Sequence, residues 1–135
     1  MAPSYLTGAC LCKKNSIPHY SAHSRAVAQG SGFSANIVVA QSSFEYTKGS
    51  PKLYLDGSNK GGVVYREFCA DCGTPFTSRS DDDEEEVAVK SGTLDDEDRE
   101  RCGELGMEIY CRRKDGWVDG IGGEGVKKLN QSMDG

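Results

Sequence analysis

Apolar and polar side chains alternate over short stretches of this chain, and the alternation predicts β-strands. From Phe33 to Val39 every second residue is apolar. Because successive side chains of a strand point to opposite faces, this run predicts a strand with one strongly apolar face. A second run, Val63 to Cys69, is rich in β-branched and aromatic residues and follows the pair Gly61-Gly62. We expect the stretches 33–40 and 63–69 to be the central strands of a sheet.

Other short runs of the same kind predict the remaining strands. They are Phe44 to Tyr46, Lys52 to Asp56, Val87 to Lys90, and the alternating stretch Met107 to Arg112. Stretches with the 3.6-residue period of a helix are few: we expect a helical turn between Ala22 and Gln29 and an acidic turn between Thr93 and Arg99. The sequence therefore predicts an all-β fold of antiparallel sheets with few short helical turns.

The length and the N-terminal sequence narrow the class of protein. With 135 residues and no long linker, the chain is expected to form a single domain, 1–135. No segment approaches the ~20 consecutive apolar residues of a membrane-spanning helix, which argues against a membrane protein. The stretch Met1 to Gly8 lacks the basic and then apolar pattern of a secretory signal. We therefore expect an intracellular, cytoplasmic protein.

The charge distribution argues against nucleic acid as a partner. The formal net charge is −5 and the isoelectric point is near 5.0, whereas nucleic-acid binding draws on clustered lysine and arginine. The only basic triplet, Arg112-Arg113-Lys114, is too short to form such a surface. Residues 81–86 are six consecutive carboxylates, which repel one another and predict a solvated loop tip. A weak cation site or a contact with a basic partner is the alternative.

Four cysteines form the main candidate site. Cys10 and Cys12 lie near the start, and the second pair, Cys69 and Cys72, begins 57 positions beyond Cys12. Zn²⁺ in structural sites prefers four thiolates in a tetrahedron, and the Gly73-Thr74-Pro75 segment predicts a turn that directs the second pair toward one metal. The sequence predicts one structural Zn²⁺ ion per chain. Disulfides and buried thiols are the alternatives, and a thioredoxin-like redox site is disfavoured because a turn follows the pair.

Several single residues have ordinary structural interpretations. Cys102 and Cys111 are expected to be structural thiols, with Cys111 on the apolar face of its strand. His19 follows a proline and is expected to be a surface histidine. Trp117 is expected to be a core or rim anchor and not a platform for a cofactor.

Five segments together resemble the glutathione-dependent formaldehyde-activating enzyme family, which also includes the centromere protein V domain. They are Gly8 to Cys12, Gly30 to Asn36, Arg66 to Pro75, Ser91 to Asp96, and Glu108 to Tyr110 together with Trp117. The segments occur in the family's order, and the resemblance covers about residues 8–128. Residues 129–135 are expected to be a flexible tail.

The resemblance implies a fold, an activity and a ligand. The fold is an all-β arrangement of coiled antiparallel sheets around a structural zinc held by Cys10, Cys12, Cys69 and Cys72. The activity is of the carbon–sulfur lyase type on glutathione adducts such as S-hydroxymethylglutathione. A small thiol-containing ligand such as glutathione is the implied partner, bound near His23, Ser31 and Asn36.

The chain departs from the family at the segment that precedes Gly30. Family members carry a second cluster there, Cys-His-Cys-x-x-Cys, which holds the zinc associated with catalysis. The corresponding segment, Tyr20 to Val27, contains His23 but no cysteine, and hydroxyl groups are poor zinc ligands beside thiolates. His23 is left as the one candidate catalytic residue. We expect weak or no lyase activity, and a zinc-stabilised module that binds a small molecule or a protein without turnover is the alternative.

Overall fold

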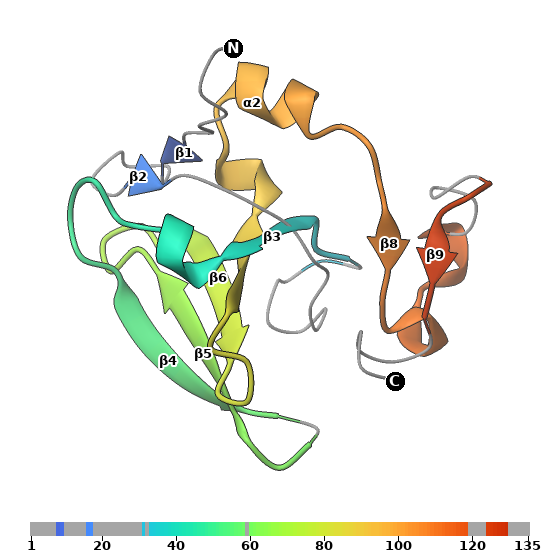
Figure 1. Ribbon diagram of the computed structural model, residues 1–135, viewed down its shortest axis with the longest axis horizontal. Helices are drawn as coiled ribbons and strands as arrows, with labels where there is room; N and C mark the ends of the chain where they lie inside the picture. The colour runs from blue at the N-terminus through green and yellow to red at the C-terminus, as the bar shows by residue number, and fades with distance from the viewer. Residues whose placement is uncertain are drawn as a thin grey trace.

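A five-stranded antiparallel sheet forms the centre of the computed structural model (Figure 1). The structure describes residues 8–9, 16–17, 31, 33–58, 60–118 and 124–129. The strands of the sheet are β3 (Asn36–Ala40), β4 (Lys52–Gly57), β5 (Val63–Phe68), β6 (Pro75–Ser80) and β7 (Glu86–Lys90). Their order across the sheet is β3-β7-β6-β5-β4, and every neighbouring pair is antiparallel.

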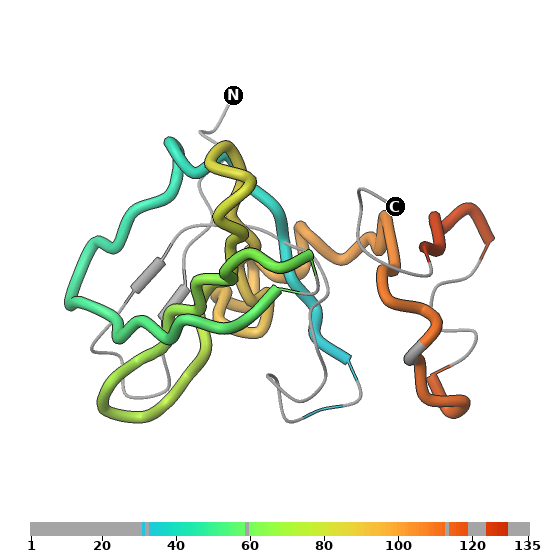
Figure 2. The backbone as a smooth tube through the Cα atoms, turned by 90° about the horizontal axis from the view of Figure 1, so that it is seen from below, coloured from blue at the N-terminus to red at the C-terminus, as the bar shows by residue number. Residues whose placement is uncertain are grey.

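Shorter elements surround this sheet. Strand β1 (Gly8–Ala9) pairs with β2 (Ser16–Ile17) in antiparallel fashion, and β8 (Met107–Glu108) pairs with β9 (Lys127–Lys128) in parallel fashion. The helical elements are α2 (Asp96–Arg101) and the 3-10 turns η1 (Gln41–Ser43), η2 (Ser91–Thr93), η3 (Cys111–Arg113) and η4 (Gly116–Val118). In both views β8 and β9 lie to one side of the sheet (Figures 1 and 2). The all-β class with antiparallel sheets and short helical turns is confirmed.

The core lies against one face of the sheet. Its buried members are Cys69, Phe76, Val87 and Val89, and half-buried Val39, Phe44, Tyr46 and Cys72 pack against them. The pairing register between β5 and β6 shifts at Glu67/Phe68, so that β6 carries one extra residue, Phe76. Such a bulge re-aims a side chain, and here the fully buried Phe76 ring packs with Val87 and Val89 of β7.

Two strand predictions need correction. The stretch 33–40 was expected to be central, but β3 begins only at Asn36 and lies at an edge of the sheet, beside β7 alone among the described strands. Phe44 to Tyr46 is not a strand. Its two aromatic rings pack on the core instead, with Tyr46 in edge contact with both Phe44 and Phe76. Of the apolar face predicted for 33–40, Ile37 is buried and Val39 half-buried, whereas Phe33 is 42% exposed.

The other predicted strands lie close to their expected bounds. The run that begins at Val63 forms β5, an interior strand as predicted, and β4 and β7 match their predicted runs. The alternating stretch Met107 to Arg112 is a strand only at its first two residues, and Cys111 lies half-buried in η3. The expected helical turn at Ala22 to Gln29 lies outside the described residues.

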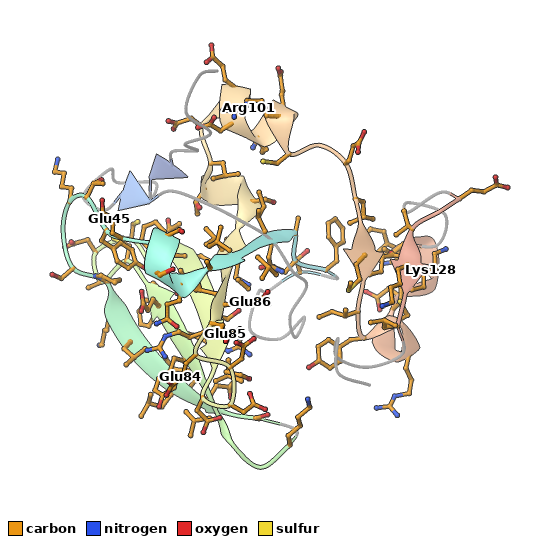
Figure 3. All side chains as sticks on the ribbon, viewed as in Figure 1. Glu45, Glu84, Glu85, Glu86, Arg101 and Lys128 are labelled. Carbon is orange, nitrogen blue, oxygen red and sulfur yellow. The ribbon has the colours of Figure 1, made fainter. Side chains whose placement is uncertain are left out.

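The charged segments largely follow the prediction. Residues 81–85 form the turn that joins β6 to β7, Glu86 is the first residue of β7, and all six but Asp83 are exposed. Figure 3 labels Glu84, Glu85 and Glu86. The acidic turn after Thr93 forms the helix α2, with three carboxylates in its first turn. Negative charges at the N-terminus of a helix stabilise it by interacting with the helix dipole. Arg101, at its other end, pairs with Asp98 at 2.9 Å (Figure 3). No helix in the described ranges is long and apolar enough to cross a membrane.

Truncating a buried and an exposed apolar side chain of the sheet should change the free energy of unfolding by very different amounts. Phe76 is fully buried, whereas Leu55 of β4 is 59% exposed. We expect Phe76→Ala to lower the free energy of unfolding by about 3–5 kcal/mol because it leaves a cavity in the core. Leu55→Ala should change it by less than about 0.5 kcal/mol. Urea denaturation followed by circular dichroism measures both, and equal effects would contradict the assigned core.

Candidate functional site

The antiparallel topology gathers the candidate residues at one end of the sheet. Strands β5 and β7 end where β6 and β3 begin, because neighbouring strands run in opposite directions. The turn that carries Cys69 and Cys72 joins β5 to β6 at this end. Lys90, the last residue of β7, and Asn36, the first residue of β3, are paired across the two strands at the same end.

The turn between β5 and β6 holds two thiols at a fixed separation. The backbone N–H of Cys69 donates to the carbonyl oxygen of Thr74 at 2.9 Å, and the N–H of Gly73 donates to the carbonyl oxygen of Cys69 at 2.8 Å. Gly73 has φ of +74°, a conformation that glycine adopts without steric cost. The predicted turn at Gly73 is confirmed, and its hydrogen bonds fix the backbone on both sides of the two cysteines.

The two cysteines differ in their exposure to solvent. Cys69 is fully buried, and Cys72 is half-buried with its Sγ 3.2 Å from the Thr74 hydroxyl. The aromatic rings of Phe44, Tyr46 and Phe76 pack in the same cluster. Burial raises the pKa of the Tyr46 hydroxyl far above its ordinary range, and the nearby Glu67 adds to the effect. Tyr46 therefore stays protonated next to the cysteines.

The other two predicted zinc ligands, Cys10 and Cys12, lie outside the described residues. Strand β1 ends at Ala9, directly before Cys10, and Figure 1 draws β1 and β2 toward the same end of the sheet as the cysteine turn. Among the described residues, no group of three or more histidine, cysteine or acidic side chains is arranged to hold a metal ion. The structure thus places half of the predicted thiolate set.

A second group of polar residues is buried at the same end of the sheet, and of its members only Asn36 was singled out from the sequence. Lys90 is 6% exposed, Asn36 is 4% exposed and Ser34 is 7% exposed. The Lys90 Nζ donates to the Asn36 Oδ1 at 2.6 Å and to the Ser34 Oγ at 3.2 Å. The Ser34 hydroxyl donates to the Asn36 Oδ1 at 2.9 Å, and the Asn36 Nδ2 donates to the Ser34 carbonyl at 3.2 Å. We call these three residues the lysine cluster.

Burial changes the charge of the amine in the lysine cluster. Loss of hydration lowers the pKa of Lys90 from its ordinary value to about 7, and the positive charge of Arg66 lowers it further. Arg66, on β5, is itself paired with Asp56 at 2.9 Å. Near neutral pH, a substantial share of Lys90 is therefore a neutral amine, whereas an exposed lysine is almost entirely protonated.

The predicted ligand-binding residues are only partly placed. Asn36 is present in the lysine cluster, where its amide is engaged with Lys90 and Ser34. Ser31 is exposed, and His23 and His19 lie outside the described residues. Lys90 was missed because it lies on the face of the strand opposite Val87 and Val89, and the alternating pattern predicts that this face is exposed to solvent. Trp117 is 68% exposed with its ring centroid 6.3 Å from that of Phe33, so it belongs to the rim and not to the core.

Comparisons with known proteins identify one family. The family model described as "Glutathione-dependent formaldehyde-activating enzyme" matches residues 5–113. Among solved structures, the crystal structure of a Rhodobacter sphaeroides protein, a structural genomics target, is 18% identical with a TM-score of 0.48 and covers 67% of this chain and 88% of its own. No curated protein matches the sequence.

The lowered pKa of Lys90 predicts a specific dependence of stability on pH. The unfolded chain binds the Lys90 proton up to pH ~10.4, whereas the folded chain releases it near pH 7. Stability therefore rises with pH between these values and is lowest below the folded pKa. Relative to Lys90→Met, we expect the wild type to gain about 1 kcal/mol per pH unit from pH 7 to 9. Urea denaturation at each pH tests this, with exposed Lys48→Met as the control, and parallel curves for wild type and Lys90→Met would contradict it.

Proposed function

Because this chain belongs to the family of glutathione-dependent formaldehyde-activating enzymes, we propose that it is a zinc-stabilised protein that binds glutathione or a similar thiol adduct. Cys10, Cys12, Cys69 and Cys72 hold one Zn²⁺ ion in this proposal. The family's carbon–sulfur lyase reaction is retained weakly or not at all. The single observation that carries the zinc assignment is the preformed turn of Cys69 and Cys72.

The turn between β5 and β6 fits the requirements of a structural zinc site. Two cysteines separated by two residues on a tight turn are a recurring half of tetrahedral thiolate sites. Here the backbone hydrogen bonds around Gly73 fix the turn. Tyr46 and Phe76 pack in the same apolar cluster as the two cysteines, and Cys69 is fully buried there; apolar surroundings of this kind are common around metal sites.

A bound zinc would supply folding energy through its four thiolate ligands, with no open position for substrate. In that role, Cys69 and Cys72 hold the end of the hairpin to the N-terminal pair. The side chains of Phe76 and Tyr46 keep the thiols in an apolar setting, and the Thr74 hydroxyl lies within hydrogen-bonding distance of the Cys72 sulfur. In this proposal the cysteines bind the metal, the aromatic side chains surround the thiols, and none of these residues takes part in a catalytic step.

The sequence between the two cysteine pairs supports low catalytic activity. No cysteine occurs between Cys12 and Cys69, so three thiolates of the kind found in the family's second cluster are missing. His23 offers one good ligand and leaves general acid–base assistance as its remaining role. The same observation favours the second candidate function, a module that binds its ligand without turnover.

Replacing one thiol of the proposed zinc site should unfold the domain. Structural zinc contributes on the order of 10 kcal/mol of apparent binding free energy, comparable with the ~5–15 kcal/mol stability of a whole domain. We expect one zinc per wild-type chain by elemental analysis, and loss of both zinc and soluble folded protein in Cys69→Ser. Cys111→Ser, outside the proposed set, should keep the metal. A soluble, zinc-free Cys69→Ser protein with an unchanged melting temperature would overturn the assignment, and two zinc ions per chain would overturn the stoichiometry.

The loss of the second cysteine cluster predicts very slow chemistry on glutathione adducts. A missing Lewis acid costs several kcal/mol of transition-state stabilisation, and each ~1.4 kcal/mol is a tenfold loss of rate. We expect wild type to form S-hydroxymethylglutathione from glutathione and formaldehyde at the rate of the protein-free control. Shifts of NMR signals near Ser31 and Asn36 should still report ligand binding. A rate well above the control that disappears in His23→Ala would restore the enzyme.

A further inference from the structure

Strand β4 carries three consecutive apolar side chains that the sheet does not bury. Leu53 is 47% exposed, and Tyr54 and Leu55 are each 59% exposed. β4 is the last strand in the order of the sheet and, among the described strands, pairs only with β5; Figure 1 shows it at the outer edge of the sheet. An exposed apolar strand at the edge of a sheet is a template for pairing with another strand.

We propose that β4 is a self-association strand, which pairs in antiparallel fashion with β4 of a second copy of this chain about a two-fold axis at Tyr54. The pairing joins the two five-stranded sheets into one continuous sheet. It depends neither on the proposed zinc site nor on glutathione binding.

The hydrogen bonds near the β4–β5 turn show which backbone groups of β4 point away from β5. The N–H of Ser58 donates to the Gly62 carbonyl at 2.9 Å, and the N–H of Asp81 donates to the Val63 carbonyl at 3.0 Å. Val63 therefore directs its carbonyl toward β6. Hydrogen-bonded and non-hydrogen-bonded pairs alternate along an antiparallel ladder. The outward N–H and C=O groups of β4 thus belong to Leu53, Leu55 and Gly57, and those of the alternate residues face β5.

A two-fold axis at Tyr54 matches these outward groups. Leu53 of one copy then lies opposite Leu55 of the other, and the two residues exchange both N–H···O bonds. The two Tyr54 residues form a non-hydrogen-bonded pair, in which side chains lie closer together than in a bonded pair. Because side chains alternate along a strand, the leucines of both copies gather on one face of the joined sheet and the tyrosines on the other.

The two ends of β4 carry opposite charges, which favours a second copy over an unrelated strand. With the axis at Tyr54, Lys52 of each copy lies opposite Asp56 of the other, and opposite charges in cross-strand pairs stabilise the pairing. Asp56 is already paired with Arg66 at 2.9 Å, so Lys52 of the second copy adds to an existing ion pair. An axis one residue away in either direction no longer places these charges opposite each other.

The size of the contact predicts a weak, closed dimer. Pro51, which has no N–H to donate, precedes β4, and the strand ends at Gly57. One pair of such short strands belongs with the small interfaces that are typical of transient association. Pairing about a two-fold axis uses the β4 edge of both copies, so growth stops at two chains. We expect a reversible dimer at micromolar or higher concentration.

Amide hydrogen exchange as a function of concentration tests the pairing. The full chain is measured by NMR and by sedimentation equilibrium from ~50 μM to ~1 mM, where weak associations become populated. We expect a monomer–dimer equilibrium without larger oligomers. The N–H groups of Leu53 and Leu55 should exchange several-fold more slowly at the higher concentration, because they gain hydrogen bonds in the dimer. The N–H of Tyr54, which faces β5 in the monomer, should change little.

Two variants test the contact, each with a matched control. Lys52→Glu places like charges opposite each other at Asp56, so the dissociation constant should rise about tenfold. Lys48→Glu, at an exposed position outside β4, makes the same change of net charge and should leave the constant unchanged. Leu55→Lys should abolish the dimer, because an edge lysine opposes strand pairing. Leu105→Lys, at an exposed leucine between α2 and β8, should not.

Three outcomes would overturn the proposal. A chain that stays monomeric up to ~1 mM would exclude self-pairing and leave the edge to a strand of another protein. A dimer in which the Leu53 and Leu55 amides exchange at an unchanged rate would use a different surface. Equal effects of Lys52→Glu and Lys48→Glu would contradict the axis at Tyr54. Circular dichroism checks the fold of each variant, and the exchange measurement on the wild type decides the question even if a variant fails to fold.

Discussion

The antiparallel pairing of β5 with β6 is the interaction on which the rest of the molecule depends. One extra residue in β6 directs Phe76 into the cluster that also contains Cys69, so the same hairpin closes the core and presents the thiols. The pairing of Thr77 and Ser78 with β7 extends the sheet from this hairpin, and β7 in turn supports β3. A change in the β5–β6 register would move Phe76, the cysteine turn and the lysine cluster together, because register determines which face each side chain occupies.

The two groups at the end of the sheet represent two different solutions to burial. The cysteine side chains pack with aromatic rings, and little polar surface has to be satisfied there. The lysine cluster buries an amine, an amide and a hydroxyl, and its hydrogen bonds offset part of the lost hydration. The part of the lost hydration that these hydrogen bonds do not replace disfavours the charged amine and lowers the pKa of Lys90. Titratable residues with strongly shifted pKa values are enriched at functional sites, although structural networks shift pKa values as well.

The sequence predicted the parts of the fold that local patterns control. The β-branched run from Val63 and the glycine after Cys72 each act on neighbouring residues, and both were correctly interpreted. The edge position of β3 was missed because alternation shows which face is apolar but not which strands are neighbours. Phe44 and Tyr46 were identified as apolar but assigned to a strand, because burial of aromatic rings does not require backbone pairing. The lysine cluster depends on residues 54 and 56 positions apart, which only tertiary structure brings together.

The compactness of the cysteine turn has a consequence for the order of assembly. A hairpin closed by so few residues forms in about 1–10 μs, far sooner than contacts between distant parts of the chain. With zinc assigned as proposed, Cys69 and Cys72 would already act as a chelating pair while the N-terminal cysteines are still distant. Joining Cys12 to Cys69 closes a loop of 57 positions, at an entropic cost of about 3–4 kcal/mol. The metal would then bind Cys69 and Cys72 first, and Cys10 and Cys12 would complete its coordination in a later step of folding.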